Sequence, residues 1–248
     1  MFLSWMIASD RSTGTRSSLY VYLRKDGSVC GVAFFGRQVV LAADDDEAIR
    51  AFSEIAPGYR FERMIVGPRA VVERYWERVS KWHPPPRRVR ESQPVLVLDR
   101  VSLPVTPGGV RVRTAHPDEW QLVAHNSAKM IEHELEYDPR GISAEFNANV
   151  RMMIDRGLWW VGEYAGELCF FCNAGPRSES TLQLQGIWTP EHLRGRGLAT
   201  QALAGICARL LLEVPSLSLY VNGFNEPALR LYERVGFRRT SELATLLF

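Results

Sequence analysis

The sequence lacks an apolar run long enough to cross a lipid bilayer, and it lacks the marks of a secretory signal. Its apolar opening, residues 1–8, has neither the basic start nor the small-residue cleavage site of a signal peptide. No charge of one sign predominates, because 30 basic and 28 acidic residues leave a formal net charge of +2. We therefore expect a cytoplasmic protein with no membrane partner and no nucleic-acid partner.

Cysteine is scarce, and the four present show no spacing of a disulfide framework, which agrees with a reducing compartment. Cys169 and Cys172 form a C-x-x-C pair, a pattern that chelates zinc or carries redox chemistry elsewhere. Here the pair lies in a predicted strand, where residues three apart face opposite sides, and no second pair completes a site. We predict that both pack in a core and that the chain binds no metal.

The 248 residues, 46% of them hydrophobic, can bury two modest cores, and the length favours two domains. A proline-rich basic stretch, residues 83–88, predicts an extended connector. A second break at residues 103–109 contains proline and glycine and is followed by a new alternating strand. We place the boundary there, with domains at residues 1–104 and 105–248.

The pattern of the first half predicts three strands, then a helix, a strand, a second helix and a last strand. The strands are expected at residues 19–24, 29–35, 37–42, 63–66 and 95–98, and the helices at 44–55 and 70–82. Asp44 to Glu47 is an acidic run that resembles a cation site. We interpret it as the first turn of a helix, where negative charge suits the helix dipole.

The second half predicts a complete αβ domain. Strands are expected at residues 110–113, 158–164, 167–173, 181–189 and 217–221 and in a closing segment to residue 248, and helices at 117 onward, 143–156, 199–212 and 225–235. Pro117 suits the first position of its helix, because its backbone φ is already helical.

Residues 194–199, Arg-Gly-Arg-Gly-Leu-Ala, connect a predicted strand to a predicted helix. Such a glycine turn forms an anion site, since the first N–H groups of a helix have no partner within it. Alone, the hexamer is also typical of surface turns. Its context is more specific, because residues 225–237 predict a helix that begins at an Asn cap and ends at Gly236.

Together the two segments resemble the acetyl-CoA-binding core of the GCN5-related N-acetyltransferases, the GNAT superfamily. Arg194, Gly197 and Ala199 fit the family's Arg/Gln-x-x-Gly-x-Gly/Ala signature, and residues 225–237 fit its Asn-x-x-Ala-x-x-Leu-Tyr-x-x-x-Gly-Phe helix. The resemblance implies an α/β (α+β) fold with a mixed, mostly antiparallel central sheet flanked by helices. It also implies splayed strands at the CoA site of the second domain.

A narrower resemblance is to a bacterial group in which a domain of unknown function precedes a GNAT domain. Residues 65–68, 93–96 and 244–248 carry it. We therefore predict two GNAT-like domains, the first one degenerate. Its segment 67–70, which we take as the counterpart of the glycine turn, contains Pro68 and so lacks one N–H donor.

The resemblance implies that acetyl-CoA is the acyl donor, and it identifies the residues that contact it. Strand residues Ile187, Trp188 and Thr189 are expected to bind the pantetheine arm through their backbone. The pyrophosphate is expected at Arg194, Gly195, Arg196, Gly197, Leu198, Ala199 and Thr200. Tyr232 is expected to touch the cofactor at its reactive end, and Asn225 is expected to touch the cofactor or an ordered water nearby.

Acetyl transfer to an amine needs a base for the amine, a donor for the oxyanion and an acid for the leaving sulfur. The resemblance puts the acid at Tyr232, whose phenol is neutral at pH 7 and able to donate. Many relatives have a carboxylate in the strand before the glycine turn, where this chain has Gln183 and Gln185. The base is therefore His133, Glu134 or a relaying water.

Four carboxylates in residues 132–138 favour a cationic amine acceptor, either a small molecule or a protein, such as a lysine side chain, a protein N-terminus or a polyamine. We expect a monomer or homodimer. The alternative is a non-catalytic acyl-CoA-binding regulatory module, which the missing carboxylate favours and Tyr232 with Asn225 disfavours. Tandem folds that transfer amino acids from charged tRNA are usually basic and lack the CoA turn, so we discount that class.

Overall fold

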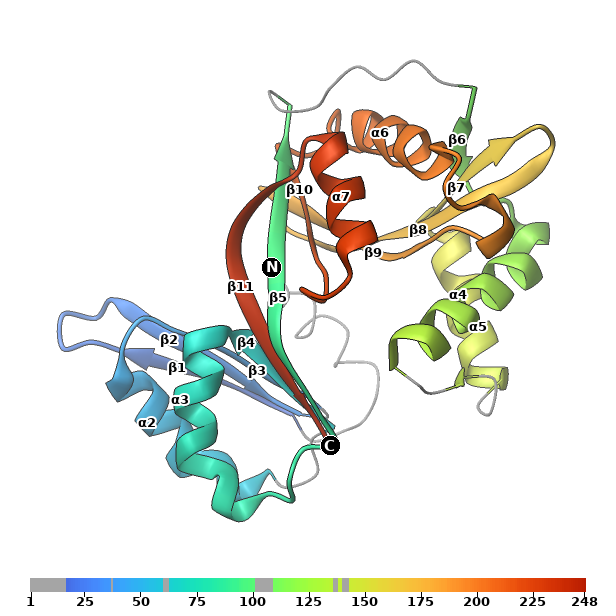
Figure 1. Ribbon diagram of the computed structural model, residues 1–248. Coiled ribbons are helices and arrows are strands. Elements are labelled where there is room, and N and C mark those ends of the chain that lie inside the picture. The colour runs from blue at the N-terminus through green and yellow to red at the C-terminus, as the bar shows by residue number, and fades with distance from the viewer. Residues whose placement is uncertain (1–16, 37, 60–62, 101–108, 136–137, 140–142) are drawn as a thin grey trace. The chain divides into compact units, whose positions relative to one another are not determined.

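The computed structural model describes residues 17–36, 38–59, 63–100, 109–135, 138–139 and 143–248 (Figure 1). Its contacts divide the chain into two compact units. The first comprises residues 1–95, 220–226 and 239–248, and the second comprises residues 96–219 and 227–238. Each unit is a mixed sheet flanked by helices, which confirms the predicted fold class. Within the described part of the chain, no helix is long and apolar enough to span a membrane.

The first unit is a mixed sheet with two helices. Its elements are β1 (Ser18–Leu23), β2 (Val29–Phe35), β3 (Gln38–Ala43), α2 (Asp46–Ile55), β4 (Met64–Pro68), α3 (Arg69–Val79), the first part of β5 (Arg88–Asp99), and β11 (Arg238–Leu247). The strand order is β1-β2-β3-β4-β11-β5. β1, β2 and β3 pair antiparallel, whereas β4 runs parallel to β3, so α2 is the crossover between two parallel strands.

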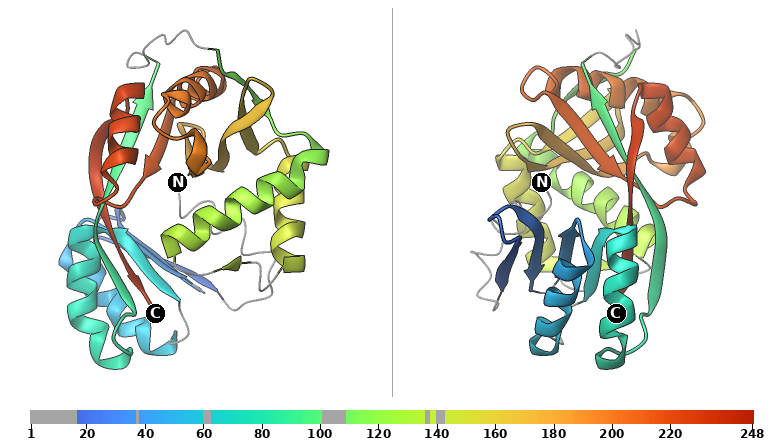
Figure 2. Two further views of the ribbon diagram at one scale, coloured as in Figure 1. Left: turned by 45° about the vertical axis from the view of Figure 1, so that its right-hand side comes forward. Right: turned by 90° about the vertical axis from the view of Figure 1, so that its left-hand side faces the viewer.

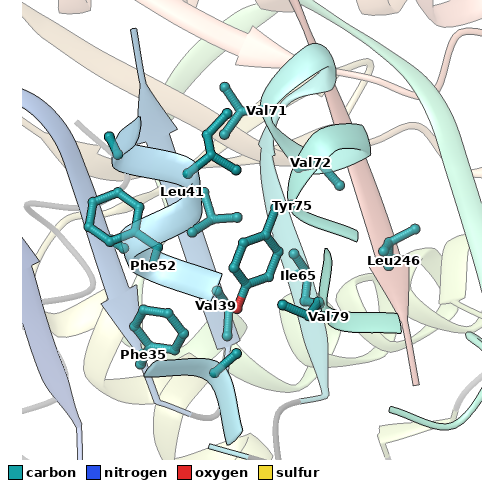
Figure 3. Close-up of a cluster of buried hydrophobic side chains, with 14 of the residues drawn as sticks. Phe35, Val39, Leu41, Phe52, Ile65, Val71, Val72, Tyr75, Val79 and Leu246 are labelled. Atoms are coloured by element: carbon teal, nitrogen blue, oxygen red, sulfur yellow. The ribbon is translucent and has the colours of Figure 1, made fainter. Parts of the chain in front are cut away.

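Helices α2 and α3 cover one face of this sheet (Figure 2). Their apolar sides and the strands beneath them form a core that includes Phe35, Phe52, Ile65 and Tyr75 (Figure 3). α2 begins at the N-cap Asp45, whose carboxylate accepts a hydrogen bond from the backbone N–H of Ala48 at 3.0 Å. That hydrogen bond is the main cause that lowers the pKa of Asp45. The prediction of an acidic first helical turn is confirmed.

The last strand of the chain belongs to the first unit. β11 pairs antiparallel with β4 and also neighbours β5, so the C-terminal end completes the N-terminal sheet (Figure 1). A single cut near residue 105 therefore does not describe the compact units. The segment 101–108 around that cut lies outside the described residues. The sequence boundary between the two domains stays a prediction.

The second unit contains the remaining elements. They are β6 (Arg111–Thr114), α4 (Trp120–Leu135), α5 (Ser143–Asp155), β7 (Trp159–Tyr164), β8 (Glu167–Arg177), β9 (Thr181–Trp188), α6 (Leu198–Leu210), β10 (Ser216–Tyr220) and α7 (Glu226–Val235). The strand order is β10-β9-β8-β7-β6. All predicted elements are present, and most of their ends shift by a few residues. The largest difference is at β5, which begins at Arg88 instead of residue 95. In the second unit, β8 extends to Arg177 instead of residue 173, and Pro117 starts a 3-10 turn, Pro117–Glu119, so α4 begins only at Trp120.

β9 and β10 are parallel, and α6 connects them. This is the arrangement of β3, α2 and β4 in the first unit, so the turn that corresponds to residues 194–197 is the acidic one between β3 and α2. Our choice of residues 67–70 as the counterpart is therefore wrong. Gly67 has a packing role instead, because a Cβ built there would lie 2.5 Å from the carbonyl oxygen of Leu41.

The four cysteines are free and buried, which confirms the predicted core packing of Cys169 and Cys172. Cys169 and Cys172 lie in β8. Burial raises the pKa of the Cys172 and Cys207 thiols, so both stay protonated and inert. Among the described residues, no group of three or more His, Cys, Asp or Glu side chains is arranged to hold a metal ion.

Candidate active site

The glycine turn leads into α6 through two left-handed residues. Gly195 and Gly197 both have φ of +74°, and Gly197 is the N-cap of α6 without a side-chain hydrogen bond. A Cβ built on either glycine would meet no protein atom within 4 Å. The positive φ values favour glycine at these two positions. Packing does not require it, because the space beside each glycine is open. Successive turns of this kind make a concave arrangement of N–H groups that suits an anion.

Two arginines of the turn lie over aromatic rings. The guanidinium of Arg194 is 4.5 Å from the Trp188 ring centroid, and its Nε donates to the Thr189 carbonyl oxygen at 3.1 Å. The guanidinium of Arg196 is 5.6 Å from the Tyr164 ring centroid. Arg194 therefore connects the turn to the end of β9. Both arginines are exposed and contribute positive charge beside the turn.

The strand before the turn has an open edge. β9 pairs with β10 only between residues 181–183 and 216–218, and the remainder of the described β9 has no β10 partner. The predicted positions Ile187 and Trp188 lie on this edge, and Thr189 follows it directly. Backbone groups without a strand partner are free to bind an extended, peptide-like group.

A bulge interrupts β9 beside this edge, and the sequence interpretation missed it. Phe171 pairs with Trp188 but Asn173 pairs with Gln185, so β9 carries one extra residue there, and Gly186 has φ of +60°. A Cβ on Gly186 would lie 2.7 Å from Nδ2 of Asn173. A glycine inside a predicted strand is the signal that could have revealed it.

The side chains around the bulge are polar and aromatic. Trp159 lies 3.3 Å from the Cβ position built on Gly186. Asn173 Oδ1, Trp159 Nε1 and Trp188 Nε1 are buried and have no hydrogen-bond partner in the described part of the chain. Met130 of α4 closes the same place, with its methyl carbon 3.7 Å from that Cβ position. The bulge in β9 therefore lies against α4.

Tyr232 is buried in α7, as the seventh residue of the helix. Burial is the main cause that raises the pKa of its phenol, and the charge of Glu134 and the Cys172 thiol raise that pKa further. The phenol is therefore protonated at neutral pH and available as a donor. The charge of Glu134 at the end of α4 therefore acts on the Tyr232 phenol.

The remaining residues considered for catalysis lie at the end of α4, before α7 and in β9. His133 is exposed, and its ring centroid is 6.0 Å from that of Trp188. Asn225 directly precedes α7, and its backbone N–H donates to the Asn222 carbonyl oxygen at 2.9 Å. Gln183 is buried and is a neutral amide, unable to serve as a base. Glu136 and Tyr137 of the acidic segment lie outside the described residues.

Comparison with known proteins gives two family matches. The model of the acetyltransferase (GNAT) family matches residues 119–237, and a domain of unknown function, DUF4081, matches residues 17–123. Among solved structures, a GCN5-related N-acetyltransferase from Kribbella flavida is similar, with a TM-score of 0.61 and 12% identity over 99% of this chain and 92% of the other. A comparison with curated proteins gives no match.

Two further structures show the same fold. A tandem GNAT protein from the clavulanic acid biosynthesis pathway has a TM-score of 0.56 and 14% identity, covering 98% of this chain and 86% of the other. A GNAT-family acetyltransferase from Colwellia psychrerythraea has a TM-score of 0.60 and 10% identity, covering 93% and 85%. At such identities the likeness concerns the fold alone.

Proposed function

We propose that the chain is an acyltransferase that moves an acetyl group from acetyl-CoA to a primary amine, and the match of the GNAT acetyltransferase family at residues 119–237 supports this. The observation that carries this proposal is the glycine turn. Gly195 and Gly197 hold left-handed conformations at the start of α6, with open space in front of them. Backbone N–H groups at a helix start are suited to the pyrophosphate of CoA.

The open edge of β9 supports the same donor. Its backbone groups at Ile187 and Trp188 have no β10 partner and can bind the peptide-like pantetheine arm. The arm would lead from the glycine turn along β9 towards the bulge at Gly186. Asn225 and Tyr232 then act at the reactive end of the donor, as the family resemblance implies.

We assign the proton transfers to Tyr232 and Glu134. The amine attacks the thioester carbonyl carbon, a tetrahedral intermediate forms, and its carbon–sulfur bond breaks. The raised pKa of Tyr232 keeps its phenol protonated at neutral pH, and the phenol donates this proton to the leaving sulfur. Glu134, directly or through His133 or a water, takes the proton from the amine. The carboxylate charge near Tyr232 also favours a cationic amine as acceptor.

The test is CoA release in the presence of cationic, neutral and anionic primary amines, for the wild type and for Tyr232→Phe. We expect turnover with cationic amines and a loss of about a hundredfold in kcat for the variant. Glu134→Gln removes the proposed base and should also lower kcat. Full turnover of Tyr232→Phe would remove the phenol as the acid. Acetylation of only neutral or anionic amines would refute the acceptor class.

The second candidate function is a non-catalytic acyl-CoA-binding module. The observation in its favour is that Gln183 is a buried amide in the strand where many relatives have a carboxylate. A pure binding module has no need of a phenol held protonated beside Glu134. Tight CoA binding without CoA release for any amine of the panel would favour this second candidate.

A further inference from the structure

The loop before α7, residues 221–225, is held by β5, a strand from the N-terminal part of the chain. The backbone N–H of Gly223 donates to the Ser92 carbonyl oxygen at 2.8 Å, and that of Val221 donates to the Pro94 carbonyl oxygen at 3.2 Å. The approach is close, since a Cβ on Gly223 would lie 2.8 Å from Ser92 Oγ. All of these residues belong to the first compact unit.

Between these two backbone contacts, a buried side-chain network joins the loop to two strands. Gln93 Nε2 donates to Asn222 Oδ1 at 3.1 Å, and Thr245 Oγ1 of β11 donates to Gln93 Oε1. The exposed fractions are 1% for Gln93, 7% for Asn222 and 3% for Thr245. Buried amides of this kind have few alternative partners, so the network fixes the conformation of Asn222.

Asn222 in turn fixes Asn225. The Asn222 carbonyl oxygen accepts the backbone N–H of Asn225 at 2.9 Å, which closes a tight turn directly before α7. Thus the side chain of Asn222 is bound by Gln93, and its main chain is bound by Asn225. A change at Gln93 can therefore reach Asn225 through Asn222.

We propose that Gln93 is a positioning residue for Asn225, so the N-terminal part of the chain takes part in the acetyltransferase site. This rests on the proposed function, in which Asn225 touches the cofactor. Gln93 lies in the segment 93–96 that resembled the domain of unknown function, and it falls within the match of that domain. The inference gives this segment a role in the reaction of the second domain.

The experiment is a double-mutant cycle between Gln93→Leu and Asn225→Ala. Leucine removes both hydrogen bonds at similar volume. We expect Gln93→Leu to lower kcat/KM for acetyl-CoA by about tenfold or more, because a small misplacement of a site residue is costly. In the Asn225→Ala background, the same substitution should have little further effect. If Gln93 contributed to stability alone, Gln93→Leu would lower kcat/KM by the same factor in the wild-type and Asn225→Ala backgrounds.

The matched control is Thr240→Val, which also removes a hydroxyl of β11 bonded to β5, in that case to the Val95 carbonyl oxygen at 3.3 Å. We expect it to keep the wild-type rate. Asn222→Ala cuts the same link from the loop side, so it replaces Gln93→Leu in the cycle if that variant does not fold. Thr245→Val should have a smaller effect, since it leaves Gln93 bonded to Asn222.

Equal losses from Gln93→Leu in both backgrounds would overturn the inference, as would wild-type kinetics in Gln93→Leu and Asn222→Ala. So would an Asn225→Ala variant with wild-type kinetics and CoA affinity. If the wild type releases no CoA with any amine, the proposed function fails instead. The same cycle, measured as CoA affinity by calorimetry, then decides the inference separately.

Discussion

The two helix starts that follow β3 and β9 occupy the same position in the same strand–helix–strand topology, yet they differ in charge and in conformation. At α2 the carboxylate of Asp45 accepts from Ala48, and Asp46 and Glu47 add negative charge in the first turn. At α6 a left-handed glycine replaces the capping side chain, and Arg194 and Arg196 add positive charge nearby. The topology is shared, whereas the charge and the backbone conformation of the turn are not.

Under the proposed function, this difference is how a βαβ unit gains or loses a phosphate site without a change of fold. The helix start always has N–H groups without a partner within the helix, and a side chain or a ligand can bind them. In the first unit the protein binds one of them itself and surrounds it with carboxylates that would repel a pyrophosphate. We therefore expect CoA to bind the second unit and not the first.

The largest effect is expected from Gly197→Val. Valine at φ of +74° is strained, and its side chain would fill the open space before the turn. We expect the CoA dissociation constant to rise by about a hundredfold or more, with the fold retained. Calorimetry measures the affinity and circular dichroism the fold. Gly157→Val is the matched control, because Gly157 also has positive φ and open space around it, and an equal loss there would contradict the assignment.

The converse substitution is Gly67→Ala in the first unit. The added Cβ would lie 2.5 Å from a backbone oxygen of β3, so the strands must move apart. We expect the free energy of unfolding to fall by about 1–3 kcal/mol, with CoA affinity unchanged. Urea unfolding measures the first quantity. The control Gly58→Ala places a Cβ in open space and should be close to neutral; a wild-type stability for Gly67→Ala would show that Gly67 has no packing role.

A smaller effect on CoA affinity is expected from a negative charge in the first turn of α6, like the one in the first turn of α2. Ala199→Glu puts a carboxylate in the first turn of α6, as Glu47 is in α2. We expect CoA affinity to fall by about five- to tenfold at low salt, and less at high salt, because the repulsion is screened. Ala199→Gln is the uncharged control. Equal affinities of the two variants would show that charge at this turn does not matter.

The smallest effect concerns Tyr232 and pH. Its pKa is raised in the folded protein, mainly by burial, so the unfolded chain releases this proton at lower pH than the folded one. The contribution to stability is therefore complete below about pH 10 and is lost as pH rises above it, with a slope of up to about 1.4 kcal/mol per pH unit. Urea unfolding between pH 9 and 11 should show a shallower decline for Tyr232→Phe. Parallel declines of the two proteins would contradict the prediction.

Much of the fold could be predicted from local pattern. Alternation and helical spacing identified the elements of both units, and the acidic run before α2 was recognised as a helix start. The bulge at Gly186 was missed because strand periodicity averages over one extra residue. The wrong counterpart for the glycine turn had a different cause: whether β3 and β4 run parallel depends on pairing between distant segments, which no local pattern contains.

The sequence by itself determined that residues 194–199 form a glycine turn before a helix and that a helix with Tyr232 follows Asn225, because both rest on short-range backbone preferences. Only the tertiary structure decided that the charge of Glu134 acts on Tyr232, that β11 completes the N-terminal sheet, and that Gln93 bonds Asn222. Those facts depend on contacts between residues far apart in the chain, whose register is set by the packing of the whole sheet.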